Sequence, residues 1–365
     1  MTTHIKAQRG LSAMQPYAPG TPIEEVQRKY GLQDVIKLAS NENPLEPSPK
    51  ALAAIQQALP RLNLYPDGQC YYLRQTIAKR MGFEMEQVTV GNGADGIIQQ
   101  LCLAYLDEDS EVIVSRSSFP VYDRFTYTMR ASLIKIPLRE NYLLDLKAMA
   151  RAITDETKLV FVCNPNNPTG TILTAGEVDA FMESVPDHVL VIFDEAYFEF
   201  VDSDDYPDTF AYIRQGRHNV LTMRTFSKAH GLAGIRLGYA VAAPEILAPM
   251  HQVRGIFDVN LLAQVAGIAA LDDEEFLTRS VSANRAGLRF LYEQFARLEL
   301  NYVESHGNFV LVEIGPRALD VQQQLMERGV IVRPCTAYDM PNLLRISVGN
   351  ETQNARLIRV LEHVL

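Results

Sequence analysis

The chain has 365 residues, of which 47% are hydrophobic and 21% charged, and its formal net charge is -10. This is the composition of a globular protein, and the length suggests two domains or one large α/β domain with an appendage. The negative charge argues against a broad surface for nucleic acid or anionic membranes, although it leaves room for a local anion site.

The four cysteines are widely separated and form no C-x-x-C pair, so we expect neither a disulfide framework nor a zinc site. The seven histidines form no H-E-x-x-H motif, and we expect no metal. The N-terminal segment lacks the apolar run of a secretory signal, and apolar runs such as residues 189–193 are too short to span a bilayer. A cytoplasmic location is the expectation.

The predicted elements begin with a helix near residues 22–30 and a second helix after Pro49, flanked by loops at 16–22 and 41–49. From about residue 70, helical segments alternate with short runs of Val, Ile and Leu. The predicted helices cover residues 70–81, 96–106, 144–153 and 176–185. The predicted strands cover residues 87–90, 111–115, 132–138, 158–163, 189–195, 219–223 and 239–243. This alternation predicts an α/β fold with a mostly parallel central sheet and helices on both faces.

After about residue 255 the pattern changes to a long helical stretch, about 260–300, followed by strands, one helix at 317–328 and a C-terminal helix. We expect a smaller α+β domain there. The predicted division is an N-terminal arm and part of the small domain at 1–40, a large domain at 41–255, and a small C-terminal domain at 256–365.

Four predicted strands are followed by polar or glycine-rich loops, at residues 91–96, 164–170, 194–197 and 224–236. In open α/β sheets, ligands bind at the carboxyl ends of the strands. Four such loops at one edge therefore predict a site.

The first loop, GNGADG at 91–96, fits G-x-G-x-x-G, whose backbone N–H groups at a helix N-terminus can receive a phosphate. A dinucleotide site is disfavoured, because the acidic residues at 107–109 follow sooner than the roughly 20 residues expected for a ribose contact. An ordinary glycine turn remains an alternative.

The next two loops each offer one polar group in a constrained position. Asp194 ends an apolar strand, and a buried carboxylate needs a cationic or hydrogen-bonding partner. A metal ligand or a helix N-cap are the alternatives for Asp194. Asn167 is held in the stiff loop NPNNPTG, where it could donate an amide hydrogen bond, although a plain strand-to-helix turn is the simpler interpretation.

The last loop contains Lys228 among small residues, with Ser227 before it and Arg236 after it. An amine in such surroundings loses its proton more easily and can form a Schiff base with a carbonyl, while serine and arginine can hold a phosphate. A solvated surface lysine is the alternative. Together, the lysine, the carboxylate and the phosphate donors are what pyridoxal phosphate requires.

The order of these motifs resembles the fold-type I, class I/II aminotransferases that depend on pyridoxal phosphate. The similarity is greatest to the histidinol-phosphate aminotransferase family and extends along nearly the whole chain. Its motifs are PYAPG at 16–20, KLASNENPLEPSPKAL at 37–52, YPD at 65–67, GNGADGII at 91–98, CNPNNPTG at 163–170, FDEAYFEF at 193–200, FSKAHGLAGIRLGY at 226–239 and VRPCTAYDMPNLLRISVG at 332–349.

The resemblance implies a catalytic role for three residues. Lys228 would bind the cofactor aldehyde as a Schiff base and then act as general acid/base, and Asp194 would pair with the pyridinium nitrogen. Tyr197 would hold the phenolate oxygen together with Asn167, and Phe119 would stack on the ring.

The resemblance also implies a phosphate site and a homodimer. Ala94, Asp95, Ser227 and Arg236 would hold the cofactor phosphate. Tyr65 would reach the same phosphate from the partner subunit.

For the substrate, Arg345 resembles the arginine that binds the carboxylate of the amino donor, and Tyr17, Asn43 and Arg333 occupy matching contact positions. Guanidinium pairs with a carboxylate or a phosphate, as glutamate and histidinol phosphate would require. The implied reaction is transamination between histidinol phosphate and 2-oxoglutarate in histidine biosynthesis. An aromatic amino acid aminotransferase and a decarboxylase of a phosphorylated amino acid are the alternatives.

The chain departs from the family pattern at Gly96, Leu45, Glu46, His230 and the segment 117–119. We expect these positions near the rim of the site, where they bear on the substrate rather than on the cofactor.

Overall fold

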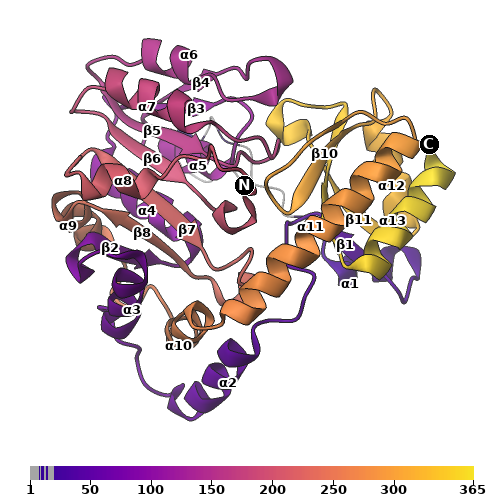
Figure 1. Ribbon diagram of the computed structural model, residues 1–365, viewed down its shortest axis with the longest axis horizontal. Helices are drawn as coiled ribbons and strands as arrows, with labels where there is room; N and C mark the ends of the chain where they lie inside the picture. Colours follow the sequence, from indigo (N-terminus) through magenta and orange to yellow (C-terminus); the bar gives the residue numbers. More distant parts are fainter. Residues whose placement is uncertain (1–7, 9, 12–13, 15–19) are drawn as a thin grey trace, which may run out of the picture.

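Two β-sheets organise the chain, as Figure 1 shows. The structure is a computed structural model that describes residues 8, 10, 11, 14 and 20–365. The larger sheet has seven strands in the order β2-β8-β7-β6-β5-β3-β4, and the smaller has five in the order β1-β11-β12-β10-β9.

In the large sheet, β8 runs antiparallel to both of its neighbours, β2 and β7, and the remaining pairs are parallel. Its strands are β2 (Val88–Gly91), β3 (Glu111–Ser115), β4 (Ser132–Ile136), β5 (Thr157–Cys163), β6 (Leu190–Asp194), β7 (Val220–Thr225) and β8 (Gly238–Ala242). Strands β2, β5, β6 and β7 therefore end at the same edge, and the predicted mostly parallel α/β fold is confirmed.

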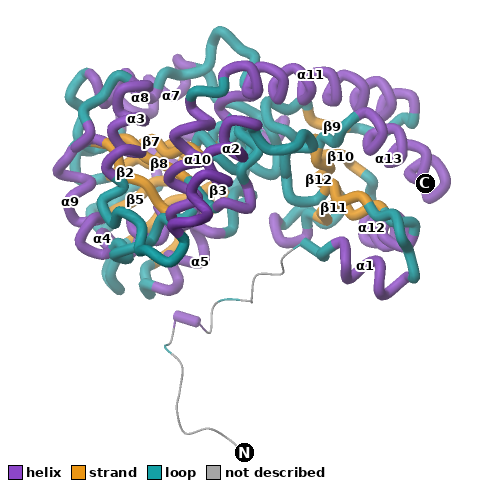
Figure 2. Tube along the Cα trace, turned by 90° about the horizontal axis from the view of Figure 1, so that it is seen from below, coloured by secondary structure: helices purple, strands orange, loops and turns teal. Residues whose placement is uncertain are grey.

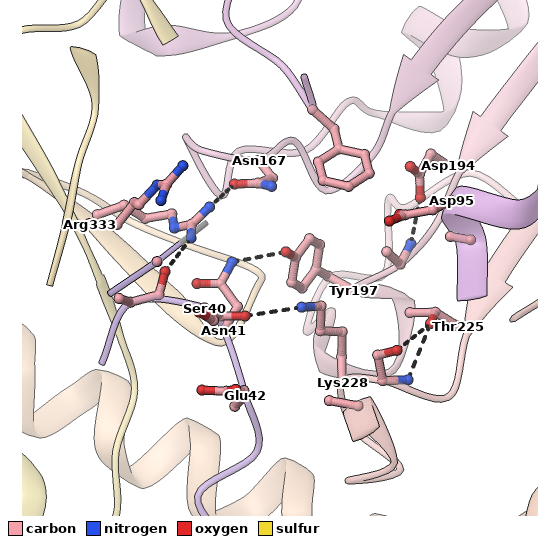
Figure 3. Close-up of a pocket in the computed structure, with 18 of the residues that line it drawn as sticks. Ser40, Asn41, Glu42, Asp95, Asn167, Asp194, Tyr197, Thr225, Lys228 and Arg333 are labelled. Atoms are coloured by element: carbon pink, nitrogen blue, oxygen red, sulfur yellow. Dashed lines mark hydrogen bonds between the residues drawn. The ribbon is translucent and has the colours of Figure 1, made fainter. Parts of the chain in front are cut away.

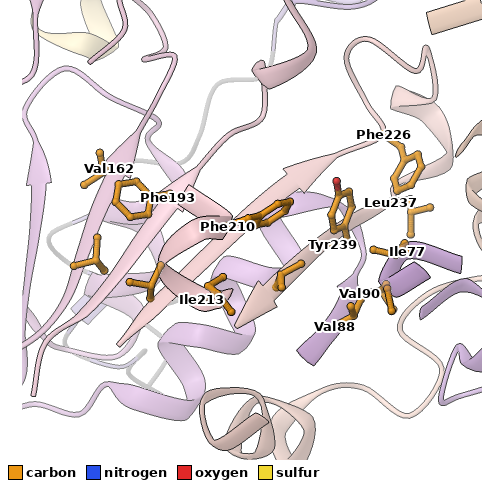
Figure 4. Close-up of a cluster of buried hydrophobic side chains, with 14 of the residues drawn as sticks. Ile77, Val88, Val90, Val162, Phe193, Phe210, Ile213, Phe226, Leu237 and Tyr239 are labelled. Carbon is orange, nitrogen blue, oxygen red and sulfur yellow. The ribbon is translucent and has the colours of Figure 1, made fainter. Parts of the chain in front are cut away.

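Alternate residues of each strand enter two separate cores, because successive side chains point to opposite faces of a sheet. In β6, Val191 and Phe193 belong to one core, whereas Leu190 and Ile192 belong to the other. The first core, part of which is drawn in Figure 4, is formed with helices α2 (Pro49–Ala58), α3 (Tyr71–Met81), α6 (Leu146–Arg151), α7 (Ala175–Ser184), α8 (Thr209–Arg214) and α10 (Leu261–Leu271). The second is formed with α4 (Gly93–Tyr105), α5 (Val121–Thr128) and α9 (Pro244–Val253).

The small sheet combines a strand from the N-terminal part of the chain with four from the C-terminal part. Its strands are β1 (Ile36–Leu38), β9 (Tyr302–Val303), β10 (Phe309–Glu313), β11 (Val330–Pro334) and β12 (Leu343–Ser347). The helices in this half of the molecule are α1 (Ile23–Tyr30), α11 (Glu274–Arg297), α12 (Ala318–Glu327) and α13 (Glu351–Val364). Figure 2 shows α11 running along one side of this half.

The structure corrects several predicted elements. The stretch at about 260–300 is two helices, because the Asp273 side chain accepts from the backbone N–H of Phe276 and starts α11 anew. Helices α5, α8 and α9 and strand β1 escaped prediction. In α5 the sequence VYDRFTYT is rich in aromatic and β-branched residues, which favour strands, and α9 contains Pro249.

The predicted domain division stays a prediction. Helix α10 lies beyond residue 255 in sequence but packs against α2 and α3 beside the large sheet. No helix in the described part of the chain is long and apolar enough to cross a membrane.

The N-terminus of α4 packs so closely against β8 that residue 238 has room for no side chain. A Cβ at this position would lie 2.7 Å from the backbone nitrogen of Ala94 and 2.8 Å from the carbonyl carbon of Gly93. Because these are backbone atoms, we expect Gly238→Ala to lower the free energy of unfolding by about 1–3 kcal/mol. Urea denaturation measures this.

The matched control is Gly176→Ala in α7, where a Cβ would meet no atom within 4 Å. It should stabilise the protein by about 0.5–1 kcal/mol, because alanine is the better helix former. Equal effects of the two substitutions would contradict the proposed close approach.

Candidate active site

A cavity of about 370 Å³ lies where the carboxyl ends of the large-sheet strands face the small sheet. Its lining residues come from both halves of the molecule. They are Gly20, Ala39, Ser40, Asn41, Glu42, Ala94, Asp95, Phe119, Cys163, Asn167, Asp194, Ala196, Tyr197, Thr225, Ser227, Lys228, Ala233, Gly234, Arg236, Arg333, Tyr338 and Arg345. The prediction that four strand-end loops meet at one site is confirmed.

Lys228 projects into this cavity from the loop after β7, as Figure 3 shows. Its Nζ donates to the backbone oxygen of Ser40 at 3.3 Å and lies 5.6 Å from the ring centroid of Tyr197. Burial, followed by the nearby Arg345 guanidinium, lowers the pKa of Lys228 to about 8. A substantial fraction of this amine is therefore neutral at mildly alkaline pH, as a nucleophile or base requires.

Neighbouring residues fix the loop that carries Lys228. Phe226 and Ala229 are fully buried, so they anchor the backbone on both sides of the lysine. The Asn43 amide donates to the backbone oxygens of Lys228 and Ala229 at 3.2 and 3.1 Å. The position of the lysine is thus set by packing and by hydrogen bonds from a distant segment.

Asp194 lies at the end of β6, buried on the side of the cavity opposite to Arg333 (Figure 3). Its carboxylate accepts from the Tyr122 hydroxyl at 2.5 Å and from the backbone N–H of Ala196 at 3.1 Å. Burial raises the pKa of Asp194 to about 6, and the hydrogen bond from Tyr122 opposes that rise. A cation placed against this carboxylate would lower the pKa and be held strongly.

The N-terminus of α4 forms an anion cradle with Arg236 and Ser227. Ala94 and Asp95 lie in the first turn of this helix, and the Arg236 guanidinium reaches 3.5 Å from Ser227 Oγ and 3.8 Å from Asp95 Oδ2. Gly93 has φ +75°, and a Cβ there would lie 2.5 Å from Arg236 Nη2, so the arginine occupies space that a side chain would take. Helix N–H groups, a hydroxyl and a guanidinium suit a phosphate.

The wall formed by the small sheet carries two arginines, Arg333 from β11 and Arg345 from β12, which are register partners. The Arg345 guanidinium donates to Asn167 Oδ1 at 2.5 Å, to the Tyr338 hydroxyl at 3.1 Å and to the backbone oxygen of Ala39 at 2.7 Å. These contacts orient it toward the loop that carries Asn167. The arrangement offers positive charge opposite Asp194.

The structure places most predicted site residues at the cavity. The residues that line it as expected are Ala94, Asp95, Phe119, Asn167, Asp194, Tyr197, Ser227, Lys228, Arg236, Arg333 and Arg345. Tyr65 does not line the cavity of its own chain, where it is 82% exposed. Tyr17 lies outside the described residues.

Asn43 requires a correction. Its amide is turned onto the backbone of the Lys228 loop and onto Ser280 Oγ, so it supports the lysine rather than lining the cavity. Asn41, two residues earlier, lines the cavity instead and donates to the Tyr197 hydroxyl at 2.9 Å. Its φ of +53°, a conformation that asparagine tolerates, turns the side chain toward Tyr197.

His230 also requires a correction. Its side chain is buried rather than at the rim, with its ring 5.0 Å from that of Phe226 and its Nε2 3.7 Å from Glu199. Burial lowers the pKa of His230 to about 4. This imidazole is therefore a neutral packing residue behind the loop.

Several site residues escaped prediction, notably Tyr122, Ser40, Asn41, Thr225 and Tyr338. Asn41 lies within the motif quoted for the resemblance, and that motif was the signal for it. Tyr338 likewise lies within a motif quoted for the resemblance, at 332–349. Tyr122 gave no usable signal, because a lone aromatic residue is more often a packing residue. In the described part of the chain, no group of three or more His, Cys, Asp or Glu side chains could hold a metal ion.

This set of residues fits pyridoxal phosphate. A buried carboxylate can face the ring nitrogen, a lysine of lowered pKa can meet the aldehyde, and the α4 cradle can receive the phosphate. Phe119 offers an aromatic face, and its ring is braced edge-on by Tyr122 at 5.7 Å.

The titration of Lys228 can be measured directly by competitive acylation. In protein freed of bound carbonyl compounds, we expect its labelling rate to rise with pH to a midpoint near 8, because burial favours the neutral amine. Mass spectrometry quantifies the peptide, and the exposed Lys158 on β5 serves as an internal reference. A midpoint at the ordinary lysine value of 10.5 would contradict the buried position.

Comparison with known proteins agrees with this geometry. The chain is 48% identical over 365 residues to a histidinol-phosphate aminotransferase of Moorella thermoacetica, covering 100% of this chain and 94% of that protein. It is 45% identical over 367 residues to a histidinol-phosphate aminotransferase of Akkermansia muciniphila, with 100% of both chains covered.

Solved structures share the fold. The crystal structure of histidinol-phosphate aminotransferase from Sinorhizobium meliloti in complex with pyridoxal-5'-phosphate matches with a TM-score of 0.91 at 26% identity, covering 100% of both chains. Aspartate aminotransferase from Thermus thermophilus with maleate matches with a TM-score of 0.84 at 25% identity, covering 99% of this chain and 100% of that one. Residues 33–361 match the family described as aminotransferase class I and II, and the chain belongs to that family.

Proposed function

We propose that this enzyme is a pyridoxal-phosphate-dependent aminotransferase that exchanges an amino group between histidinol phosphate and 2-oxoglutarate in the cytoplasm. The observation that carries the proposal is the placement of Lys228 and Asp194 in one cavity with the two arginines of the small sheet, Arg333 and Arg345. The full-length similarity to proteins named histidinol-phosphate aminotransferase supports the choice of substrate.

When bound, pyridoxal phosphate supplies an electron sink for the bonding electrons that a substrate Cα–H bond releases. The residues of the chain supply the positioning and the proton transfer. Lys228, once its amine is free and neutral, is the base that would remove the proton from the substrate Cα and then deliver it to the cofactor carbon. Asp194 would hold the ring nitrogen in its protonated state.

Other residues fix the position of the ring. Tyr197 and Asn167 would hold the phenolate oxygen, and Phe119 would stack on the ring face. Asn41 donates to the Tyr197 hydroxyl at 2.9 Å, so that hydroxyl keeps its own hydrogen to donate to a phenolate. Burial raises the pKa of Tyr197, which keeps the hydroxyl protonated.

The substrate anion would bind at the wall formed by the small sheet. Arg345 and Arg333 can pair with a phosphate in one half-reaction and with a carboxylate in the other, because guanidinium matches both geometries. This dual use explains how one site could accept histidinol phosphate and 2-oxoglutarate in turn.

Two further features support the proposed assembly and location. Tyr65 is 82% exposed and stacks on Phe257 at 4.5 Å, beside the exposed side chains of Leu62, Leu64 and Ile256. Such an apolar surface suits a homodimer in which Tyr65 reaches the cofactor phosphate of the partner. All four cysteines are free, which suits a reducing compartment.

Half-reactions with single amino donors test the proposed substrate. We expect histidinol phosphate to change the absorbance of the bound cofactor at least about tenfold faster than phenylalanine or tyrosine, because a site that buries charges for an anion penalises ligands that leave them unpaired. Stopped-flow spectroscopy measures the rates.

The control for this assay is Lys228→Ala, which should lower the rate by more than about a hundredfold, whereas Lys158→Ala should leave it unchanged. Faster turnover of the aromatic amino acids would instead identify an aromatic aminotransferase. Release of carbon dioxide from a phosphorylated amino acid would identify a decarboxylase.

Hybrid dimers test the role of Tyr65. We expect Tyr65→Ala and Lys228→Ala each to be nearly inactive alone. A reassorted one-to-one mixture should regain about a quarter of the wild-type activity, because half of the dimers are hybrids and each hybrid has one intact site. Activity is measured after dilution from mild denaturant, with each variant treated alone as the control. A mixture no more active than the separate variants would show that the sites are not shared.

A further inference from the structure

Tyr122 lies directly behind Asp194 and outside the cavity. It belongs to α5 and its side chain is fully buried. Its hydroxyl donates to Asp194 Oδ2 at 2.5 Å, while the backbone N–H of Ala196 donates to the other carboxylate oxygen, Oδ1. The residue therefore has no access to a substrate and can act on the reaction through Asp194.

The alternation of side chains in β6 explains this contact. Leu190 and Ile192 point to the face of the sheet that α4, α5 and α9 cover, and Asp194, two residues further, points the same way. Tyr122 belongs to the same core as Leu190 and Ile192. The carboxylate therefore meets this tyrosine because both occupy one face of the sheet.

Two aromatic rings hold Tyr122 in place. Its ring stacks on Phe161 of β5 at 4.4 Å with an interplanar angle of 14°, and Phe119 packs against it edge-on at 5.7 Å. A ring fixed on two sides leaves its hydroxyl little freedom. Phe119 also lines the cavity. The packing of Phe119 against Tyr122 therefore fixes both the hydrogen bond to Asp194 and the aromatic face that the cavity presents.

The other ionisable groups that influence Asp194 do not stabilise its anion. Burial raises the pKa of Asp194 most, and repulsion from Asp95 of α4 and from Glu195, the residue after β6, raises it further. Burial raises the pKa of the Cys163 thiol of β5 to about 12, so this neighbour adds no charge near neutral pH. Burial also raises the pKa of Tyr122 well above its usual value, which keeps its hydroxyl a donor.

We propose that Tyr122 is a positioning residue that, through its hydrogen bond to Asp194, keeps the shared proton on the ring nitrogen of the cofactor. This proposal rests on the proposed function. The ring nitrogen and the carboxylate compete for one proton, and a donor to the carboxylate weakens it as a base. With the donor removed, the proton shifts from nitrogen to oxygen, which weakens the electron sink.

The test compares wild type with Tyr122→Phe, which removes one oxygen and keeps the stacked ring. Each holoenzyme is loaded with pyridoxal phosphate labelled with ¹⁵N in the ring, and the ¹⁵N chemical shift is recorded at pH 7.5. We expect the signal of the variant to move toward that of unprotonated pyridine. We also expect kcat to fall about tenfold while KM for the amino donor stays within about twofold.

Tyr212→Phe is the matched control. The Tyr212 hydroxyl also donates to a carboxylate, that of Asp179, at 2.5 Å, but this pair lies on α7 and α8 away from the cavity. The control should leave the ¹⁵N signal and kcat unchanged. An unchanged ¹⁵N signal in a folded, cofactor-loaded Tyr122→Phe protein would overturn the proposal, as would an equal shift in the control.

The Asp194→Asn background separates a proton effect from a structural one. If Tyr122 acts through the carboxylate, then Asp194→Asn and the double variant should give the same ¹⁵N signal and the same cofactor affinity. An additional loss in the double variant would contradict the proposal. This comparison also tests the proposal if Tyr122→Phe alone fails to fold. In the double variant residue 194 is an uncharged asparagine, so no buried carboxylate is left without its hydrogen-bond donor.

The outcome is separable from that of the proposed function. A wild-type protein that binds no labelled cofactor would refute the proposed function itself. If the wild-type protein binds the labelled cofactor and gives a pyridinium signal, the proposed function stands, and the variants then test the role of Tyr122 separately.

Discussion

The cavity holds the carboxylate of Asp194 and the amine of Lys228 away from bulk water, and much of the structure keeps these two ionisable groups buried there. Burial raises the pKa of Asp194 to about 6 and lowers that of Lys228 to about 8. Both shifts bring the pKa of the group closer to neutral pH, where each group can take up or release a proton readily. A cofactor with a basic ring nitrogen and an aldehyde would satisfy both groups at once.

The large sheet provides the first half of this arrangement. Because β2, β5, β6 and β7 all end at one edge of the sheet, the loops that follow them lie close together although they are far apart in sequence. The loop after β7 is further fixed by a segment from the other half of the molecule, since Asn43 binds its backbone oxygens. Lys228 is thus held by contacts 185 residues apart in sequence.

The small sheet provides the second half. The Arg345 guanidinium donates to Asn167 at 2.5 Å and to the backbone of Ala39 at 2.7 Å, and the Asn41 backbone N–H donates to Ser347 Oγ at 2.8 Å. These contacts tie the segment after β1 between β12 and the large sheet. A movement of the small sheet would therefore move Arg333, Arg345 and the environment of Lys228 together.

The sequence by itself determined the α/β class and the strand-end loops that carry Lys228 and Asp194, because these features depend on local hydrophobic patterns and on motifs. Strand alternation also placed Asp194 at a strand end, although it could not name what lies behind it. The tertiary structure alone decided that Asn41 rather than Asn43 lines the cavity, that His230 is buried, and that Tyr122 donates to Asp194. Each of these depends on a backbone turn or on a contact between distant elements, and such contacts arise from packing that no local pattern encodes.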